Sequence, residues 1–189
     1  MRIELDQNFA ARKIKTFLKS FGKPAEVAVA RSLNRAIQGV RTDSAVEVRK
    51  EYNVKATPVK KSFRMERAGL GALEAAAVAS GRRIPLVDFG ARPKQPGGRK
   101  PVDGVSVQVK KERKVLKHSF LARLKSGHVG VFQREGDARL PINQKFGPSI
   151  PEMIGNQEVV DRIQANAEQR FSKTLDHEID FALQKLGAR

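Results

Sequence analysis

The chain of 189 residues is long enough to form one domain with a substantial hydrophobic core. It contains no cysteine, which excludes a disulfide scaffold, a thiolate zinc site and a cysteine nucleophile, and fits a protein assembled in a reducing cytoplasm. The formal net charge of +17 indicates a polyanion or an acidic protein surface as a partner.

The positive charge is concentrated in the first two thirds of the chain. Residues 1–60 carry a net charge of +7, residues 61–125 carry +11 and residues 126–189 carry −1. A charge that serves only solubility is an alternative, but such a charge need not leave one third of the chain nearly neutral. No apolar run reaches the length of about 20 residues that a membrane helix needs, and the N-terminus lacks the pattern of a secretory signal. We therefore expect no membrane partner.

The first 62 residues are predicted to be mainly helical. Apolar residues at helical spacing predict an amphipathic helix over about Asp6–Phe21, with Asp6 as its cap. A second helix is predicted to start near Pro24 and keeps the same period as far as Val48. Gly39 and the polar residues that follow it weaken the middle of this helix, which allows a kink there. Both apolar stripes are expected to form core.

A short basic helix is predicted next, with Thr57 as its cap and Pro58 at the first helical position. Together with the preceding helix and turn, it superficially resembles a helix-turn-helix that reads DNA. The segment is too short to fill a major groove well, so a plain helical connection is the preferred interpretation.

The apolar period changes from helical to alternating after Phe63, which predicts strands. Apolar runs over Leu73–Val78 and Ile84–Phe89 flank the turn-forming segment Ser80–Arg83, and this pattern predicts a hairpin. Pro85 places the second of these strands at a sheet edge, because proline cannot donate a ladder hydrogen bond.

The densest basic stretch of the chain follows, with 11 basic and 2 acidic residues over Arg92–Lys125. It includes Gly90–Gly104, whose three prolines and four basic residues predict a loop that is flexible unless a partner orders it. The alternation of valine with polar residues over Val105–Val109 predicts a strand. Aromatic residues are not interleaved with the lysines over Lys110–Lys117, which favours contact with phosphates or carboxylates over contact with bases.

We expect these basic side chains to make sequence-independent contact either with DNA phosphates or with an acidic neighbouring protein. The residues assigned to this contact are Arg92, Lys94, Arg99, Lys100, Lys110, Lys111, Arg113, Lys114 and Lys117. The second possibility, a protein interface, is slightly preferred.

The segment His118–Met153 is predicted to form a hairpin followed by a capped helix. A short strand lies near Val129–Phe132, and the charged turn Arg134–Asp137 leads to a second strand over Leu140–Phe146. Pro141 places this second strand at a sheet edge.

The C-terminal part is predicted to be helical. Ser149 is the predicted cap of a helix with Pro151 in its first turn and Glu152 at the third position after the cap. A long helix then runs from about residue 157 to 186 with one continuous apolar stripe. The residues of this stripe assigned to assembly are Phe171, Leu175 and Ile179. We expect the helix to pack partly on its own domain and partly on a neighbouring subunit.

The predicted fold class is α+β, with two N-terminal helices, a mainly antiparallel sheet over about Phe63–Phe146, a long basic loop and a long C-terminal helix. We treat residues 1–189 as a single domain. Its helical N-terminal part is residues 1–62, its β-rich part residues 63–146 and its C-terminal helical part residues 147–189.

No constellation of residues predicts catalysis. His177 and Asp180 lie one helical turn apart, but two ligands do not make a metal site. Ser126 and His128 lack the surroundings of a nucleophile elbow, and the Gly69–Gly71 segment lacks the third glycine of a phosphate-binding loop. We therefore expect no enzymatic activity, no metal and no cofactor.

Six short motifs occur in order along the chain. They are L-N-R-A at Leu33–Ala36, R-K-E-Y at Arg49–Tyr52, S-G-R-R-I-P-L at Ser80–Leu86, S-G-H-x-G-V-F-x-R at Ser126–Arg134, L-P-I at Leu140–Ile142 and G-P-S-I-P-E-M at Gly147–Met153. In this order they resemble the minor tail protein Z family of tailed phages and prophages. The resemblance extends from about residue 30 to the C-terminal helix, and the loop Arg92–Asp103 does not match closely.

The residues of the last three motifs that carry the resemblance are Ser126, Gly127, His128, Gly130, Phe132, Pro141, Gly147, Pro148, Ser149 and Pro151. The resemblance implies a structural virion protein that completes the head-proximal end of the tail and helps to join the tail to the head–tail connector. It implies a location in the virion, and in the host cytoplasm during assembly.

Closed symmetry is the usual solution for such an assembly, so we expect a homo-oligomeric ring. The expected sixfold number comes from phage tails in general. The neighbours that the resemblance implies are tail terminator, tail tube or head–tail connector proteins, with DNA in the channel as a further partner. The alternative function is that of a sequence-independent nucleic-acid-binding protein.

Overall fold

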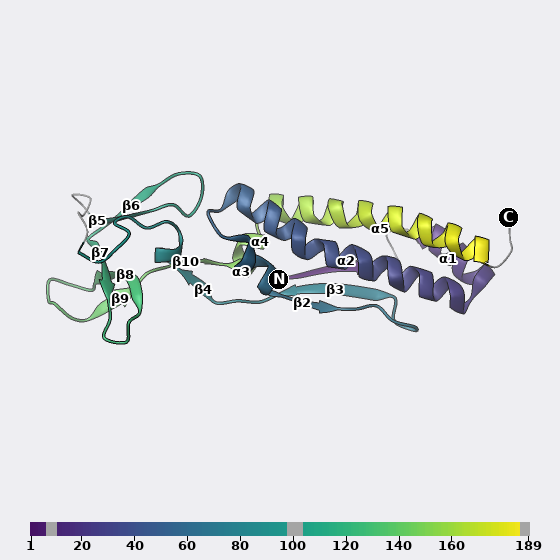
Figure 1. Cartoon of the computed structure of the whole chain (residues 1–189), viewed down its shortest axis with the longest axis horizontal. Helices are drawn as coiled ribbons and strands as arrows, with labels where there is room; N and C mark the ends of the chain where they lie inside the picture. Colours follow the sequence, from purple (N-terminus) through teal and green to yellow (C-terminus); the bar gives the residue numbers. More distant parts are fainter. Residues whose placement is uncertain (7–10, 98–103, 186–189) are drawn as a thin grey trace.

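The computed structural model describes residues 1–6, 11–97 and 104–185 (Figure 1). The molecule is elongated, with a pair of long helices and one small β-sheet beside them at one end, and the other small β-sheets towards the opposite end (Figure 1). The elements in chain order are β1 (Arg2–Asp6), α1 (Ala11–Phe21), α2 (Lys23–Glu51), α3 (Ala56–Lys61), β2 (Phe63–Glu66), β3 (Glu74–Ala79), β4 (Arg83–Pro85), the 3-10 helix η2 (Leu86–Asp88), β5 (Gly104–Val107), β6 (Lys114–Lys117), β7 (Ser119–Arg123), β8 (Val129–Arg134), β9 (Ile142–Gln144), β10 (Phe146–Ser149), α4 (Ile150–Ile154) and α5 (Gln157–Lys185).

The helices α2 and α5 lie side by side and run antiparallel, and each has 29 residues (Figure 1). Apolar side chains at helical spacing are buried on both helices, and they include Leu33 and Ile37 on α2 and Ile163 and Phe171 on α5. Alanine and serine are frequent on the buried side of α2, which allows close approach of the helix axes. The predicted C-terminal helix is confirmed, with its last described residue at Lys185.

Gly39 lies at a close approach between the two helices and does not interrupt α2. A Cβ atom at this position would lie 1.9 Å from Nη1 of Arg170, so the glycine leaves the space that the guanidinium group occupies. Arg170 donates to both carboxylate oxygens of Asp43, at 2.7 and 3.2 Å. The hydrogen bond to Asp43 raises the pKa of Arg170 above its ordinary value. The kink that Gly39 allowed is absent, and α2 is one continuous helix.

The strand β3 lies between β1 and β2 in an antiparallel sheet beside the helix pair. Its alternate residues Ala75, Ala77 and Ala79 belong to the hydrophobic core, and β3 contacts α2. Small side chains at these positions let the sheet approach the helices closely. The strand β1 was not predicted, and Asp6 is its last residue and not a helix cap. Residues 7–10, where the predicted helix began, lie outside the described residues.

The predicted hairpin of Leu73–Val78 with Ile84–Phe89 is wrong. Both edges of β3 are occupied by β1 and β2, so β3 has no free edge for the next strand. The chain passes through Ser80–Arg82 to β4, which pairs with β10 instead. β4 belongs to a two-stranded sheet and thus lies at an edge, as Pro85 predicted.

At the β end, β7, β8 and β9 form an antiparallel sheet, and β5 pairs with β6. The predicted strand over Leu140–Phe146 is divided at Lys145 into β9, which pairs with β8, and β10, which pairs with β4. The backbone of Lys145 connects the two sheets, because its N–H donates to Val131 and its carbonyl accepts from Leu86. β9 is an edge strand that directly follows Pro141.

The predicted cap Ser149 is present at the start of α4, whereas the predicted cap Thr57 is not at the start of α3. Ser149 forms a capping box with Glu152, in which the Ser149 N–H donates to Glu152 at 2.7 Å and its hydroxyl accepts from the Glu152 N–H at 3.3 Å. The helix α3, by contrast, begins at Ala56 with Lys55 as its cap, so Thr57 lies inside it. Val59 of α3 is fully buried, which agrees with a plain helical connection.

The α+β fold class is confirmed. Every strand pairing in the described part of the chain is antiparallel, as predicted, but the strands are divided among four small sheets and do not form one. Of the six strand pairings among the described residues, four join consecutive strands, and β1–β3 and β4–β10 join segments far apart in the sequence.

Replacing Phe171 with alanine is expected to lower the free energy of unfolding by about 3–5 kcal/mol, because the side chain is fully buried and its loss leaves a cavity. Chemical denaturation followed by circular dichroism measures this change. The matched control is Phe181→Ala on the same helix, where the side chain is 49% exposed and we expect a loss below about 1 kcal/mol. Equal midpoints for the two variants would contradict the burial of Phe171.

Candidate interaction surface: a cleft bordered by lysines

A cleft of about 850 Å³ lies where the C-terminal end of α2 meets the β5–β6 hairpin. We call it the lysine-rimmed cleft. The residues that line it are Glu51, Tyr52, Leu86, Val107, Val109, Lys110, Lys111, Glu112, Lys114, Val115, Leu116, Pro148 and Glu152. Most of these side chains are apolar, and the three lysines are exposed. Three glutamates, Glu51, Glu112 and Glu152, also line the cleft, so its border is of mixed charge and suits a partner that is apolar at its centre and charged around it.

The two lysines that precede β6 hold the hairpin to the end of α2. The ammonium group of Lys110 lies 5.4 Å from the ring centroid of Tyr52, and Nζ of Lys111 lies 3.8 Å from a carboxylate oxygen of Glu51. Contacts of this kind at exposed positions are worth at most about 1 kcal/mol each. Both lysines can therefore exchange these contacts for contacts with a partner.

Arg113 has a role within the chain. Its Nη1 donates to the carbonyl oxygen of Gly90 at 2.9 Å and to that of Ser106 at 3.2 Å. These bonds fasten the β5–β6 hairpin to the turn that follows η2. We therefore assign Arg113 a structural role, although the sequence grouped it with the contact residues.

Lys114 and Lys117 are exposed residues of β6, and no carboxylate of a described residue pairs with either of them. Lys114 lines the cleft and Lys117 does not, because residues three apart in a strand point to opposite faces. Arg92 and Lys94 are exposed on the opposite side of β5, where Arg92 bridges Ser106. The predicted basic cluster is thus divided over several surfaces, and Arg99 and Lys100 lie outside the described residues.

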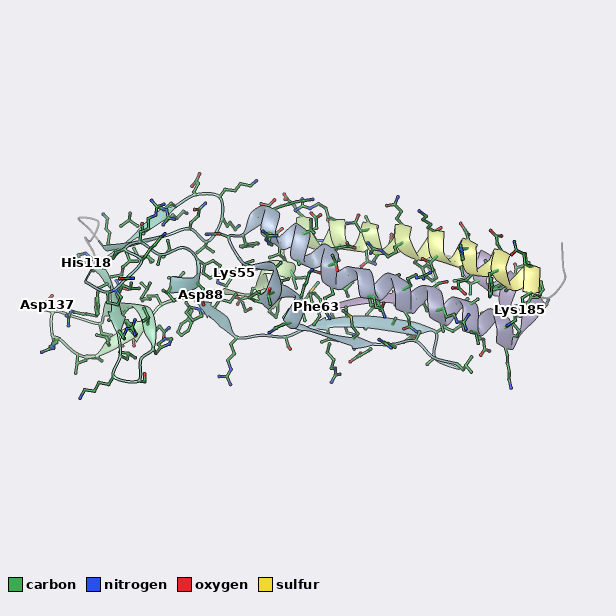
Figure 2. The ribbon with its side chains drawn as sticks, in the orientation of Figure 1. Lys55, Phe63, Asp88, His118, Asp137 and Lys185 are labelled. Carbon is green, nitrogen blue, oxygen red and sulfur yellow. The ribbon has the colours of Figure 1, made fainter. Side chains whose placement is uncertain are left out.

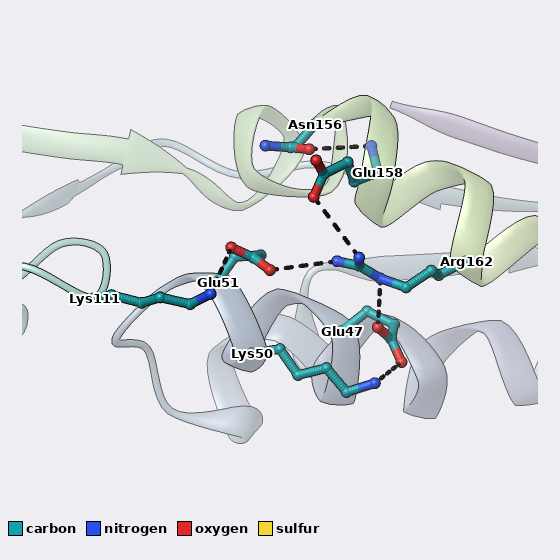
Figure 3. A network of polar contacts seen from close by, with 7 residues as sticks. All are labelled: Glu47, Lys50, Glu51, Lys111, Asn156, Glu158 and Arg162. Carbon is teal, nitrogen blue, oxygen red and sulfur yellow. Dashed lines mark hydrogen bonds and ion pairs between the residues drawn. The ribbon is translucent and has the colours of Figure 1, made fainter.

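A network of ion pairs connects the cleft to both long helices (Figure 3). Glu47 of α2 has a side chain that is only 6% exposed, and it pairs with Lys50 at 2.7 Å and with Arg162 of α5 at 2.8 Å. Arg162 also lies 3.6 Å from Glu51, which in turn faces Lys111 (Figure 3). Glu51 thus links Lys111, through a weak and exposed pair, to the network between α2 and α5.

Sequence reasoning missed this network. Glu47 falls within the apolar period of α2, where an acidic residue is expected to need a buried partner. The position of Glu47 in this apolar period is the signal that the sequence offers. Its partner Arg162 lies 115 positions further along the chain in α5, so no local pattern identifies it. Asn156 also belongs to this region, since its side chain accepts from the Glu158 N–H at 3.1 Å and caps α5 (Figure 3).

Glu152 lines the cleft but is engaged in capping α4. The N–H of Ser149 donates to its carboxylate, and this bond lowers the pKa of Glu152 below its ordinary value. A lowered pKa in the folded state means that the cap contributes stability above the unfolded-state pKa and loses it as the pH falls through the folded-state pKa. At neutral pH Glu152 is therefore a charged and already bonded part of the cleft.

The residues that carry the family resemblance lie mostly in structural positions. Ser126, Gly127 and His128 form the exposed turn between β7 and β8, where Gly127 has a φ of +83°. Gly130 and Phe132 belong to β8, Pro141 precedes β9, Gly147 and Pro148 belong to β10, and Ser149 and Pro151 start α4. A Cβ atom at Gly147 would lie 2.5 Å from the buried ring of Phe89, so this glycine makes room for the ring. Of these residues, Pro148 lines the cleft.

The residues assigned to assembly on α5 lie mainly inside the chain. Phe171 and Leu175 are buried in its own core, and Ile179 is partly buried against that core. Phe181 is a large apolar side chain of α5 that is about half exposed. Phe181 lies four residues before Lys185, the last described residue of α5, and Figure 2 shows Lys185 at the end of the molecule away from the β-rich part.

Within the described part of the chain, no three His, Asp or Glu side chains are placed to hold a metal ion together. None of the helices described combines the length and the apolar character that a membrane span requires.

The family model of prophage minor tail protein Z matches residues 12–189, which is nearly the whole chain. No curated protein and no solved structure matches it.

Replacing Arg162 with alanine is expected to lower the free energy of unfolding by about 2–3 kcal/mol. Loss of one partner of a fully buried ion pair costs about 3–5 kcal/mol. The cost is smaller here, because only Glu47 is buried, Arg162 is 38% exposed and Lys50 remains beside Glu47. The control is Arg83→Ala, whose exposed pair with Glu152 at 3.8 Å should be worth less than about 1 kcal/mol. Thermal or chemical unfolding compares the two, and equal losses would contradict the role of Arg162.

Proposed function

The chain belongs to the prophage minor tail protein Z family and is thus a structural protein of the phage tail, and we propose that it completes the head-proximal end of that tail. In this role it helps to join the tail to the head–tail connector. The observation that carries the proposal is the family match over residues 12–189, which spans all of the helix pair and all of the β-rich end. The lysine-rimmed cleft supports it, because a protein at a junction needs a surface for a neighbour.

The neighbours that we propose are other copies of this chain in a ring and the tail terminator, tail tube or head–tail connector proteins. A closed ring follows from the usual symmetry of such assemblies, and its proposed sixfold order follows from phage tails in general. The elongated shape, with different surfaces at its two ends, supports contact with different neighbours at each end (Figure 1). In this proposal the protein lies in the virion and is assembled in the host cytoplasm.

Sequence-independent binding of nucleic acid is the alternative function. The net charge of +17 favours it, as do the exposed ammonium groups of Lys114 and Lys117, which no carboxylate of a described residue pairs with. Against it, Arg113 is bonded within the chain, Lys111 faces Glu51, and the basic residues of this region lie on different sides of the β5–β6 hairpin. We therefore favour an acidic protein surface as the partner of the cleft.

Deletion of the gene from an inducible prophage should give particles whose tails fail to attach productively to heads, and expression of the intact chain in trans should restore them. Electron microscopy of particles that carry a tagged, complementing chain should place the tag at the junction of head and tail. A tag at the distal tip of the tail, or a single copy on the tail axis, would overturn the proposed position or the proposed ring.

Duplex binding by the isolated protein tests the alternative function. If DNA phosphates were the partner, log Kd would rise with log salt concentration by about 0.9 per neutralised phosphate, with little preference among sequences. Under our preferred interpretation the protein shows no such binding at low salt. The comparison variant changes Lys110, Lys111, Lys114 and Lys117 to glutamine. Tight, salt-sensitive binding that is lost in this variant would favour nucleic acid as the partner.

A further inference from the structure

We propose that the exposed face of α2 in one copy packs against the exposed face of α5 in a second copy, with the two helices antiparallel and Thr42 opposite Gln169. The inference rests on the ring in the proposed function and names the contact between neighbouring subunits. It leaves the lysine-rimmed cleft for a neighbour of another kind.

The exposed face of α2 is basic. In α2, all of whose residues the structure describes, the exposed charged side chains are all basic, and they are Lys23, Arg31, Arg35, Arg41, Arg49 and Lys50. Residues three or four apart share one side of a helix, and such a row of exposed residues is formed by Arg31, Arg35, Gln38, Thr42, Val46 and Arg49. We call it the α2 row. Asp43 and Glu47 of α2 are turned toward α5 of the same chain and pair with its arginines.

The exposed face of α5 carries an acidic row. Its members, again three or four residues apart, are Asp161, Ala165, Gln169, Ser172, Asp176 and Asp180, and all are exposed except the partly buried Asp176. We call it the α5 row. Its charged members are all acidic, whereas Arg162 and Arg170 of α5 are paired with acids of α2 in the same chain. Lys173 lies on the flank of the row, and Lys185 lies beyond its end.

The two rows match position by position when the helices are antiparallel. Each row begins with one charge, continues with three neutral residues and ends with two charges one turn apart. The pairs in order are Arg49 with Asp161, Val46 with Ala165, Thr42 with Gln169, Gln38 with Ser172, Arg35 with Asp176 and Arg31 with Asp180. The rows span roughly 27 and 28 Å at about 1.5 Å per residue, so the register holds over their whole length. Small side chains at Ala165 and Ser172 let the helix axes approach each other.

The arginines of the α2 row are available for this contact. Arg31 lies 3.8 Å from Glu178 of its own chain, and its side chain is 61% exposed, so this pair is weak and can be exchanged. No carboxylate of a described residue pairs with Arg35 or Arg49. The planar guanidinium group can bond both oxygens of a carboxylate, which gives such pairs a defined geometry.

The charge pattern selects contact between unlike faces. Two α2 rows would place arginine against arginine, and two α5 rows would place acid against acid, and like charges across an interface are unfavourable. Copies in a ring whose axis runs along the helix pair all point the same way. Because α2 and α5 are antiparallel within one copy, α2 then meets the neighbouring α5 in the antiparallel direction that the register requires (Figure 1). Contact between two different faces is heterologous, and repeated heterologous contacts close into a ring when the rotation allows it.

The absence of native cysteine makes cross-linking a direct test. Val46→Cys places a thiol on the α2 row, where the native side chain is 48% exposed, and Ala165→Cys places one opposite to it on the α5 row. The two full-length single-cysteine variants are mixed and treated with a short bis-maleimide. We expect a covalent dimer that contains one copy of each variant. Its yield should fall as salt is raised, because screening weakens exposed charge pairs.

Ser172→Cys is the matched control. It lies on the same row as Ala165, is likewise exposed, and stands seven residues, roughly 10 Å, further along α5. Its mixture with Val46→Cys sets the background, and it would give the higher yield if the two helices were parallel. A yield at the background level for Val46→Cys with Ala165→Cys, or strong cross-linking of Val46→Cys with itself, would overturn the inference.

A charge exchange gives an independent readout of the same contact. Arg49→Glu in the Val46→Cys chain should lower the yield of mixed dimer severalfold, and Asp161→Arg in the Ala165→Cys chain should restore it. Lys19→Glu makes the same change of charge at an exposed position of α1 and should leave the yield unchanged. Unchanged thermal unfolding shows that each variant is folded. Equal losses for Arg49→Glu and Lys19→Glu would contradict the proposed contact.

Failure of this contact can be told apart from failure of the proposed function. If mass measurement shows rings but the mixed dimer stays at background, the contact is wrong and the ring remains. If the mixed dimer forms but the tagged protein lies at the distal tip, the contact stands and the proposed position fails.

Discussion

The rest of the structure depends on the close packing of α2 against α5. Their apolar stripes are fully buried against each other, and the absence of a side chain at Gly39 lets Arg170 cross the interface and bind Asp43. The sheet β1–β3–β2 lies on this pair through the small side chains of β3. The helix pair thus acts as a stiff rod, and the other elements are placed relative to it (Figure 1).

The lysine-rimmed cleft lies at one end of this helix pair, where α2 ends and α5 begins. Glu51 and Tyr52 stand at the end of α2, and Arg162 stands near the start of α5. Because Arg162 bridges Glu47 and Glu51, and Glu51 faces Lys111, the border of the cleft is tied to the packing of the two helices. The lysines themselves remain exposed, because their contacts with Tyr52 and Glu51 are weak.

Family membership and structure answer different parts of the functional question. The family establishes a structural protein of the phage tail. The residues that carry the family resemblance in the β-rich part serve mainly the fold, as Gly147 beneath Phe89 and the capping box at Ser149 show. The surface best suited to a partner lies instead between these motifs and the end of α2, and most of its residues belong to no motif.

Much of this architecture could be predicted from the sequence by itself, because it depends on interactions within a few residues. Helical periodicity located α2 and α5, turn residues located the β8–β9 hairpin, and Ser149 with Glu152 located the start of α4. The concentration of basic residues between Arg92 and Lys125 is likewise a property of the sequence. Only the tertiary structure decided that β1 and β2 occupy both edges of β3, that β4 pairs with β10, and that Arg162 neutralises Glu47. For β1 on β3, β4 on β10 and Arg162 on Glu47, the physical reason is that these contacts join residues far apart in the chain. The choice among possible partners depends on which edges and charges the folded helix pair leaves open.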